Sequence, residues 1–233
     1  MTTQQHPTAE TFARLAVELH DSEGVGETVE TVVQFALQAL SCRYAGLVLI
    51  ERGRKPVIAA ATAPVVTELY QLQLDAGQGP LMTALESHQP VFVTDIAHDD
   101  QWPADWQALA ASIGVCSVLH LPLMPTDHPV GVLSFFSEQP EGFDADDLAV
   151  GHILARHASI AVANARSEES LAQAVDARKL VGQAMGILME RFDLDGDRAF
   201  DVLRRYSQDS NTKLRDVAQQ LIDTRKLPTA VKQ

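Results

Sequence analysis

Cysteine, long apolar runs and positive charge are scarce in this sequence of 233 residues. The two cysteines, Cys42 and Cys116, each stand beside apolar residues, so we expect buried, unreactive thiols and no disulfide framework. No apolar run approaches the roughly 20 residues that a membrane span requires. The polar segment 1–7 lacks the basic and apolar regions of a signal peptide. We therefore expect a cytoplasmic protein with no membrane anchor.

Sequence motifs of several common enzyme classes are also missing. There is no phosphate-binding loop, no dinucleotide-binding loop, no Gly-x-Ser-x-Gly elbow and no His-Glu-x-x-His helix. His98, Asp99 and Asp100 cluster in a predicted surface loop, but no second ligand group stands at metal-binding spacing. The sequence therefore predicts a protein that is not an enzyme, with no metal site and no bound cofactor.

The shortage of positive charge is uneven along the chain. The whole sequence has a net charge of −13, which by itself argues against a nucleic-acid partner. Residues 1–165 hold 6 Lys and Arg against 20 Asp and Glu, whereas residues 166–233 hold 12 against 11. This asymmetry predicts two domains, and the second carries two thirds of the basic residues.

Residues 8–165 have the pattern of an α+β domain. Apolar positions three and four apart predict amphipathic helices, and short apolar or β-branched runs between turn residues predict strands. Short turns between consecutive strands favour a mainly antiparallel sheet over a βαβ repeat. Gly24 and Gly26 are expected to separate the first two helices. The predicted helices span 8–21, 27–41, 80–87 and 103–113, and the predicted strands span 45–51, 56–62, 91–95, 115–124 and 130–137.

Residues 144–191 contain no proline and predict one unusually long helix. Asp144 is its expected N-cap, with Asp147 in the first turn. A helix of this length must be interrupted or covered, and a second copy of the chain is the simplest cover. The sequence therefore favours a homodimer, although the coiled-coil seam is weak and a basic residue interrupts it. The seam residues are Leu171, Ala174, Arg178 and Val181.

Two shorter helices follow, over 197–208 and 212–225, each with one apolar face. Asn211 or Thr212 is the expected N-cap of the second. Together with the end of the long helix, they predict an all-α three-helix bundle. Gly182 and Gly186, four residues apart in the long helix, are expected to allow close packing within this bundle. The remaining residues, 227–233, predict a flexible tail.

The first predicted domain resembles a GAF domain of the actinobacterial kind over 8–165. The resemblance implies a central antiparallel sheet with helices on one side and a cavity for an unknown small-molecule ligand on the other. Trp102, Trp106 and Cys116 are candidates for the cavity lining. The segments that carry the resemblance are Leu74–Pro80, Gln89–Asp95, Trp102–Pro103, Gly114–Leu119 and Gly131–Phe136.

The segment Gly77–Pro80 makes a tight turn before a helix, and two interpretations stay open. Glycines at a helix N-terminus can present backbone N–H groups to an anion. They can equally serve only the turn, since glycine adopts backbone conformations that other residues avoid.

The second predicted domain resembles an ANTAR domain, the RNA-binding output domain of transcription antitermination regulators. The resemblance covers about 170–226 of the predicted domain 166–226 and all three helices in order. It rests on Ala177–Arg191, Ala199-Phe200, Leu203-Arg204 and Asn211–Ala218. One position departs from the family, because Met185 stands where a lysine is frequent. If that lysine touches RNA in relatives, this chain lacks the contact.

The resemblance implies that basic side chains of the three helices bind RNA stem-loops. Lys and Arg neutralise phosphates, and an arginine can also stack on an unpaired base, while a glutamine can hydrogen-bond a base edge. A shared face is expected but does not follow from the sequence. The candidate residues are Arg178, Lys179, Gln183, Arg191, Arg204, Arg205, Lys213 and Arg215.

We therefore predict a signal-responsive antitermination regulator in which the GAF-like domain controls RNA binding by a paired ANTAR-like domain. Two alternatives stay open. GAF-like reductases of free methionine sulfoxide use thiols, and Cys42 and Cys116 would be the candidates for such chemistry. The last two helices could instead form a helix-turn-helix that binds DNA.

Overall fold

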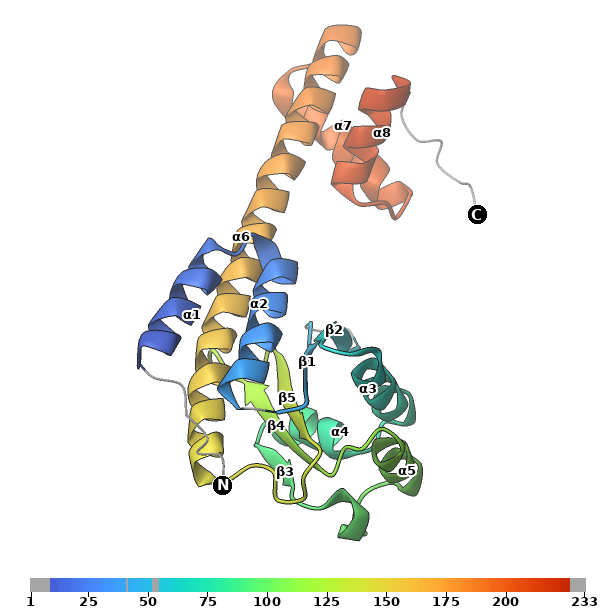
Figure 1. The fold of residues 1–233 in the computed structure, drawn as a ribbon. Coiled ribbons are helices and arrows are strands. Elements are labelled where there is room, and N and C mark those ends of the chain that lie inside the picture. The colour runs from blue at the N-terminus through green and yellow to red at the C-terminus, as the bar shows by residue number, and fades with distance from the viewer. Residues whose placement is uncertain (1–8, 41, 52–54, 227–233) are drawn as a thin grey trace. The chain divides into compact units, whose positions relative to one another are not determined.

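The structure is a computed structural model that describes residues 9–40, 42–51 and 55–226. The chain divides into two compact units, Met1–Ser167 and Glu168–Gln233, and each is described by itself (Figure 1). The flexible tail predicted for 227–233 lies outside the described residues. None of the helices in the described part of the chain is both long and apolar enough to traverse a bilayer.

The first unit is built on a five-stranded sheet in the order β2-β1-β5-β4-β3. Every pair of neighbouring strands is antiparallel, which confirms the predicted α+β class with an antiparallel sheet. Each strand lies within or beside its predicted range, one to three residues shorter or shifted. The strands are β1 (Tyr44–Leu49), β2 (Val57–Ala61), β3 (Val91–Val93), β4 (Ser117–Leu123) and β5 (Gly131–Ser137).

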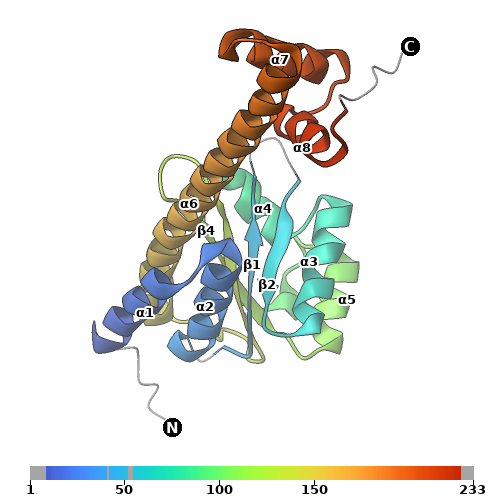
Figure 2. The same cartoon turned by 90° about the horizontal axis from the view of Figure 1, so that it is seen from above.

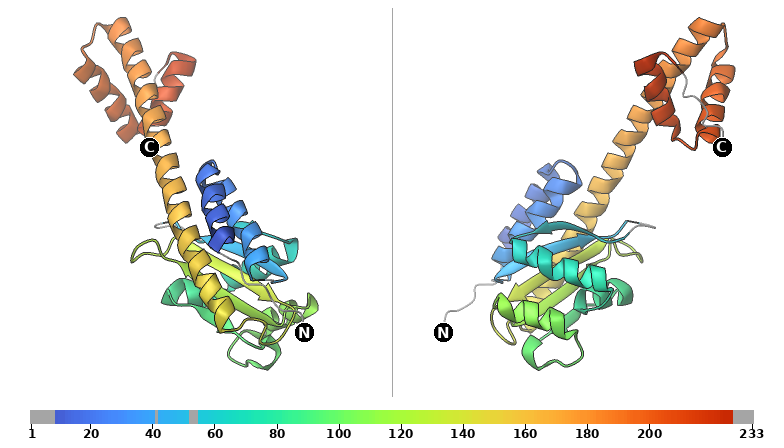
Figure 3. Two further views of the ribbon diagram at one scale, coloured as in Figure 1. Left: turned by 60° about the vertical axis from the view of Figure 1, so that its left-hand side comes forward. Right: turned by 90° about the vertical axis from the view of Figure 1, so that its right-hand side faces the viewer.

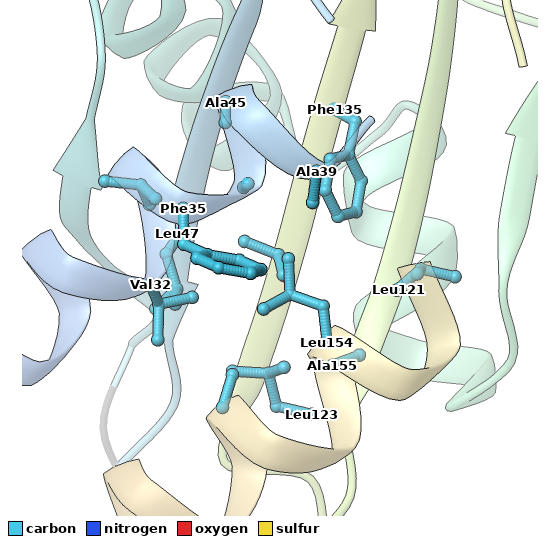
Figure 4. Close-up of a cluster of buried hydrophobic side chains, with 14 of the residues drawn as sticks. Val32, Phe35, Ala39, Ala45, Leu47, Leu121, Leu123, Phe135, Leu154 and Ala155 are labelled. Carbon is cyan, nitrogen blue, oxygen red and sulfur yellow. The ribbon is translucent and has the colours of Figure 1, made fainter. Parts of the chain in front are cut away.

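One face of the sheet is covered by α1 (Ala9–Asp21), α2 (Gly24–Ala39) and the first part of α6 (Ala145–Phe192) (Figure 3). Alternate residues of the central strands, such as Leu47 and Phe135, meet Leu154 of α6 in an apolar cluster (Figure 4). The helix α2 begins at Gly24, so the glycines predicted to separate two helices lie in its first turn. The predicted boundary at 27 is therefore wrong by three residues.

The opposite face is covered by α3 (Pro64–Ala76), α4 (Pro80–Ser87) and α5 (Ala104–Ser112), and a short 3₁₀ turn, η1 (Ile96–His98), precedes α5. A second apolar cluster fills the space between these helices and the sheet. Helices thus cover both faces, not one as the GAF resemblance suggested. Sequence analysis missed α3, which starts with Pro64 in the first turn, a position where proline is favoured because its missing N–H has no helical partner.

The long helix α6 is continuous over its 48 residues. Its N-terminus has the predicted cap in reciprocal form: Asp144 Oδ1 accepts the Asp147 N–H at 2.9 Å, and Asp147 Oδ2 accepts the Asp144 N–H at 3.0 Å. Two orphan donors of the first turn are thereby satisfied, as in a capping box. No break divides the helix, so a covering surface remains of the two options that the sequence left open.

The second unit combines the end of α6 with α7 (Gly196–Asp209) and α8 (Leu214–Thr224) (Figure 2). Its core consists of small and branched side chains from all three helices, which confirms the predicted bundle. Asp195 caps α7 by accepting the Arg198 N–H at 2.8 Å. The predicted cap of α8 is wrong, because Lys213 occupies the N-cap position without a side-chain bond. The Thr212 hydroxyl donates instead to the Ser210 carbonyl at 3.2 Å.

Candidate functional site

The eight residues predicted to bind RNA are all exposed on the second unit. Three of them form ion pairs on their own helix. On α7, Arg204 Nη2 lies 2.9 Å from Asp201 Oδ1 and Arg205 Nε lies 3.7 Å from Asp209 Oδ2. On α8, Arg215 Nε lies 3.1 Å from Asp216 Oδ1. Exposed pairs of this kind contribute about 0–1 kcal/mol. An RNA phosphate can therefore compete for these arginines at a modest cost.

Arg191 has a structural contact as well as an exposed side chain. Its Nη1 donates to the Arg225 carbonyl at 2.6 Å, and Arg225 is the C-cap of α8. A guanidinium at the end of a helix satisfies a carbonyl that has no partner within the helix. The contact fastens α6 to the end of α8, so replacing Arg191 affects the bundle as well as any RNA contact.

Three cations and one amide among the candidates are unpaired. Within the described ranges, Arg178, Lys179 and Lys213 make no ion pair, and the Gln183 side chain makes no hydrogen bond. Their charges and donors are directed to solvent without a competing carboxylate. These four residues are the most readily available for a polyanion.

Candidates that are neighbours on one helix project in different directions. Successive residues of an α-helix diverge by about 100°, so Arg178 and Lys179 project in different directions, as do Arg204 and Arg205. Residues four apart stay within about 40°, so Lys179 and Gln183 lie together. A common surface for all eight residues stays a prediction.

The glycines of α6 have a different environment from the predicted one. A Cβ added at Gly182 or Gly186 would meet no atom within 4 Å outside the helix backbone. Packing within the bundle therefore does not require either glycine. Both lie on an open side of α6, where the helix backbone itself is accessible.

The candidates for ligand binding in the first unit lie in three different environments. Trp106 is buried in the cluster beneath α5. Trp102 is partly exposed, donates from Nε1 to the Asp99 carboxylate at 2.9 Å, and lines a cleft of about 440 Å³ beside the Gly77–Gly79 turn. Cys116 is half-buried ahead of β4 and does not line that cleft. The structure therefore does not bring the three together in one cavity.

The turn at Gly77–Pro80 has a structural role. The side chain of Gln73, buried in α3, accepts the Leu81 N–H at 2.8 Å and so satisfies a free donor of α4. Gly79 has φ of +119°, and a Cβ there would lie 2.5 Å from Gln73 Oε1. Only glycine fits, and the amide that an anion would need already has a partner. The structure supports plain turn chemistry over anion binding at this position.

A buried polar cluster lies under the helices of the second face. His120 Nδ1 and Ser134 Oγ share a hydrogen bond of 2.7 Å between neighbouring strands. Tyr70 of α3 packs over Gly46, where a Cβ would be only 2.7 Å from the tyrosine hydroxyl. Within the described residues, the Tyr70 hydroxyl, His120 Nε2 and Trp106 Nε1 are buried without a hydrogen-bond partner.

Burial sets the protonation states in this cluster. Desolvation lowers the pKa of His120 to about 3, so the ring is neutral at physiological pH. Desolvation also raises the pKa of Tyr70 above its ordinary value, although contact with Ser134 opposes that shift. Sequence analysis missed both residues. The available signal was a histidine in the strand-like run 117–123, on the face opposite Leu119 and Leu121.

The two cysteines are poorly placed for redox chemistry. Burial raises the pKa of the Cys42 thiol to about 12, which suppresses the reactive thiolate. The Arg43 N–H, next to Cys42, donates to the Phe136 carbonyl, and the Cys116 N–H donates to the Ser137 carbonyl. The segments that hold the two cysteines therefore lie on opposite sides of β5. Two strand spacings separate such positions, roughly 9–10 Å, whereas disulfides need Cα atoms within about 7 Å.

The antiparallel sheet between two helical layers, with a closed polar interior, has the architecture of a GAF domain. The family model of the GAF domain matches residues 22–163, which is more than half of the chain. This protein therefore belongs to the GAF domain family. Its second unit carries an ANTAR domain, whose family model matches residues 169–222. The chain is thus a GAF–ANTAR protein.

Solved structures with a similar fold are distant in sequence. The GAF domain of an Acinetobacter phosphoenolpyruvate-protein phosphotransferase is 17% identical, covers 69% of this chain and 96% of its own, and superposes with a TM-score of 0.54. The corresponding domain from Coxiella burnetii is 16% identical, covers 69% of this chain and 95% of its own, and has a TM-score of 0.55. Free methionine-R-sulfoxide reductase from Neisseria meningitidis is 18% identical, covers 72% of this chain and 99% of its own, and has a TM-score of 0.52. At such identities they show the fold alone. No curated protein matches the chain significantly.

Proposed function

We propose that this protein is a signal-responsive regulator of transcription antitermination, which acts in the cytoplasm on stem-loops in nascent RNA. The ANTAR domain binds the RNA, and the GAF domain controls that binding in response to a small molecule or a partner protein. The observation that carries the proposal is the coincidence of the ANTAR match at 169–222 with an independent three-helix unit. That unit holds most of the basic residues of an otherwise acidic chain.

The charge distribution supports the contact with RNA. Lys179 and Gln183 lie four residues apart on one side of α6, and Arg178 projects about 100° away from Lys179. The two cations neutralise phosphates and the amide hydrogen-bonds a base edge. Arg204, Arg205 and the first residues of α8 supply further cations once their weak ion pairs open. No single element provides the whole surface, so the RNA must contact more than one helix.

A second copy of the chain is the proposed cover for α6. Within the second unit, Leu171 and Val175 are 67% and 57% exposed, and Met189 is 39% exposed. Helical geometry places these side chains, together with Gly182 and Gly186, within about 60° of one another. The resulting stripe is apolar and small, as helix pairing requires, and it does not face the bundle core.

This stripe differs from the seam expected from the sequence. Leu171 belongs to both, but Val181 packs against the bundle core instead. Val175 and the two glycines extend the stripe, and Arg178 lies at its edge, within about 20° of Leu171 around the helix. Pairing along this stripe presents two ANTAR domains to one transcript, and linked weak sites gain effective concentration.

Pairing is tested by sedimentation of the full chain. Val175→Glu places a charge in the stripe and should shift a dimer toward monomer, because an unpaired charge is costly to bury. Val17→Glu is the matched control, since Val17 is 60% exposed on α1 and lies outside the stripe. A monomer for the unaltered protein at micromolar concentration, or equal effects of both variants, would remove pairing from the proposal.

RNA binding is tested in two stages. First, transcripts crosslinked to the protein in its host are sequenced, and recovery of paired stem-loops ahead of terminators is expected. A recovered stem-loop then serves as the probe in anisotropy titrations over a range of salt concentrations. Arg178→Ala with Lys179→Ala should reduce the salt slope by about 1.5, at roughly 0.7–0.9 for each lost phosphate contact. Thermal stability should stay unchanged, because both side chains are exposed.

The control variant removes the same charge elsewhere. Arg14→Ala with Arg43→Ala alters exposed arginines of the GAF domain and should leave the slope as it is. An equal loss in both double variants would mean that net charge alone governs binding. Equal affinity for duplex DNA of the same sequence would favour the helix-turn-helix alternative instead.

The reductase alternative has little support from the cysteines. The raised pKa of Cys42 and the separation across β5 both oppose thiol chemistry. Cys42→Ser with Cys116→Ser is expected to leave RNA binding unchanged. Reduction of free methionine sulfoxide by the unaltered protein, lost in this variant, would restore the alternative.

A further inference from the structure

A second cleft of the GAF domain lies on the opposite side of the sheet from the buried His120 cluster. It has a volume of about 320 Å³ and lies between the end of α4, strand β4 and the first part of α6. Leu121 and Ala155, both buried in the cluster shared by α6 and the sheet, form its floor. A volume of this size falls in the lower range of small-ligand sites, roughly 300–1,000 Å³.

The polar groups of this cleft are basic or neutral. His152 and Arg156 come from successive turns of α6, Ser159 follows on the same side, and His88 comes from the end of α4. Positions 152, 156 and 159 are four and three residues apart, which places their side chains on one face of the helix. None of the lining residues carries a carboxylate.

This composition is unusual for its surroundings. Residues 1–165 contain only 6 Lys and Arg against 20 Asp and Glu. Nevertheless Arg156, an exposed residue, makes no ion pair with any residue in the described part of the chain. His88 and His152 likewise have side chains without a described partner. An unpaired guanidinium and two imidazoles around one cleft leave anion-binding groups available.

The rest of the lining is apolar. Pro90, Leu121, Pro122 and Met124 extend the floor away from the basic groups. A bare inorganic ion would leave this surface unused, whereas an anion with a small apolar body would cover it. The guanidinium forms paired hydrogen bonds with phosphate oxygens, and imidazoles from two other positions can donate to a third oxygen. Such three-sided donation suits a tetrahedral group better than a planar one.

We propose that this cleft binds a small phosphate monoester with an apolar body. Arg156 and His152 bind the phosphate from α6, His88 binds it from α4, and Met124 and Leu121 contact the body of the ligand. The site differs from the polar interior between the sheet and the α3–α5 layer, because α6 and the sheet face beneath it form this cleft. The proposal does not depend on RNA binding by the ANTAR domain.

Phenyl phosphate is the probe, titrated into the full chain by isothermal titration calorimetry. We expect one site per chain with Kd below about 1 mM. Arg156→Gln should raise Kd at least about tenfold, because it removes the fixed charge and the paired donors. His152→Asn and His88→Asn should each raise it less. Asparagine suits position 88 in particular, because His88 has φ of +58° and asparagine tolerates the left-handed region.

Two controls make the outcome decisive. Arg14→Gln changes an exposed arginine on α1 that pairs with Glu18, and Kd should stay the same. Benzoate has the same apolar body with a planar carboxylate and should bind at least about tenfold more weakly than the phosphate. Equal binding of benzoate, no binding of phenyl phosphate, or no change in Arg156→Gln would each overturn the proposal.

A second measurement keeps the test independent of variant folding and of RNA. In the unaltered protein, phenyl phosphate should shift the NMR resonances of the His88 and His152 imidazoles and leave those of His20 unchanged. Arg156→Gln should also keep full affinity for the stem-loop RNA. If that variant loses RNA affinity and phenyl phosphate shifts neither imidazole, the phosphates of RNA occupy the cleft and the monoester proposal fails.

Discussion

The buried histidine of β4 makes a quantitative prediction about acid stability. His120 is fully buried, and its pKa falls from 6.5 to about 3 because the charged ring would lose its hydration. In the unfolded chain the ring has its ordinary pKa. Between those two values the unfolded state binds a proton that the folded state does not. Acid therefore favours unfolding through this one residue.

The sign and size follow from proton linkage. Above pH 6.5 the ring is neutral in both states and contributes no pH dependence. Below it, the free energy of unfolding falls by about 1.36 kcal/mol per pH unit until the folded-state pKa is reached. The change from pH 8 to pH 5 therefore costs about 2 kcal/mol from His120 alone. Near pH 4 the loss is about 3 kcal/mol, a large fraction of a typical domain stability of 5–15 kcal/mol.

The assay is urea unfolding at several pH values, with signals that report on the GAF domain. His120→Asn keeps a polar group beside Ser134 but cannot take up a proton between pH 8 and pH 4. The variant loses some stability at every pH. The difference between the two proteins should nevertheless shrink by about 2 kcal/mol from pH 8 to pH 5, because the contributions of all other groups cancel. A difference that stays constant over this range would show that the ring is hydrated or protonated in the folded protein.

Three further predictions concern positions that stabilise one domain or the other. Gly79→Ala should destabilise the GAF domain by more than about 1 kcal/mol, since a Cβ would lie 2.5 Å from a buried amide oxygen at φ of +119°; Gly77→Asn, at an open position with φ of +66°, should change the melting temperature little. Leu188→Ala removes a buried side chain from the ANTAR bundle and should cost about 2–5 kcal/mol, whereas Glu190→Ala, two residues later and exposed, should cost far less in urea unfolding of the same protein. Asp144→Ala removes the cap of α6 and should cost about 0.5–2 kcal/mol; equal stability with and without the carboxylate would mean that solvent satisfies the first turn.

The secondary structure and the order of domains could be predicted because their causes are local. The absence of proline over 144–191 was sufficient to predict α6, and Asp144 could be identified as its cap because the pairing with Asp147 spans only three residues. The resemblance located both families, which the family matches confirm. α3 was missed although Val66, Leu69 and Tyr70 have helical spacing, because the polar Gln73 ends the buried stripe and Pro64 precedes it. The cap of α8 was mistaken because Thr212 bonds backward to Ser210, a choice that composition does not reveal.

The candidate sites depended on contacts between distant segments. Which cations are free depends on whether a carboxylate lies within reach, and Arg204 and Lys213 look equivalent until Asp201 is found beside the first. His120 meets Ser134 only because β4 and β5 pair in one register, and a shift by one residue would send the histidine to the opposite face. The sequence by itself determined most helices and strands and the net charge of each domain, because both depend on residues that are close together along the chain. Only the tertiary structure decided which groups are buried, paired or left available, because desolvation and pairing depend on atoms far away along the chain.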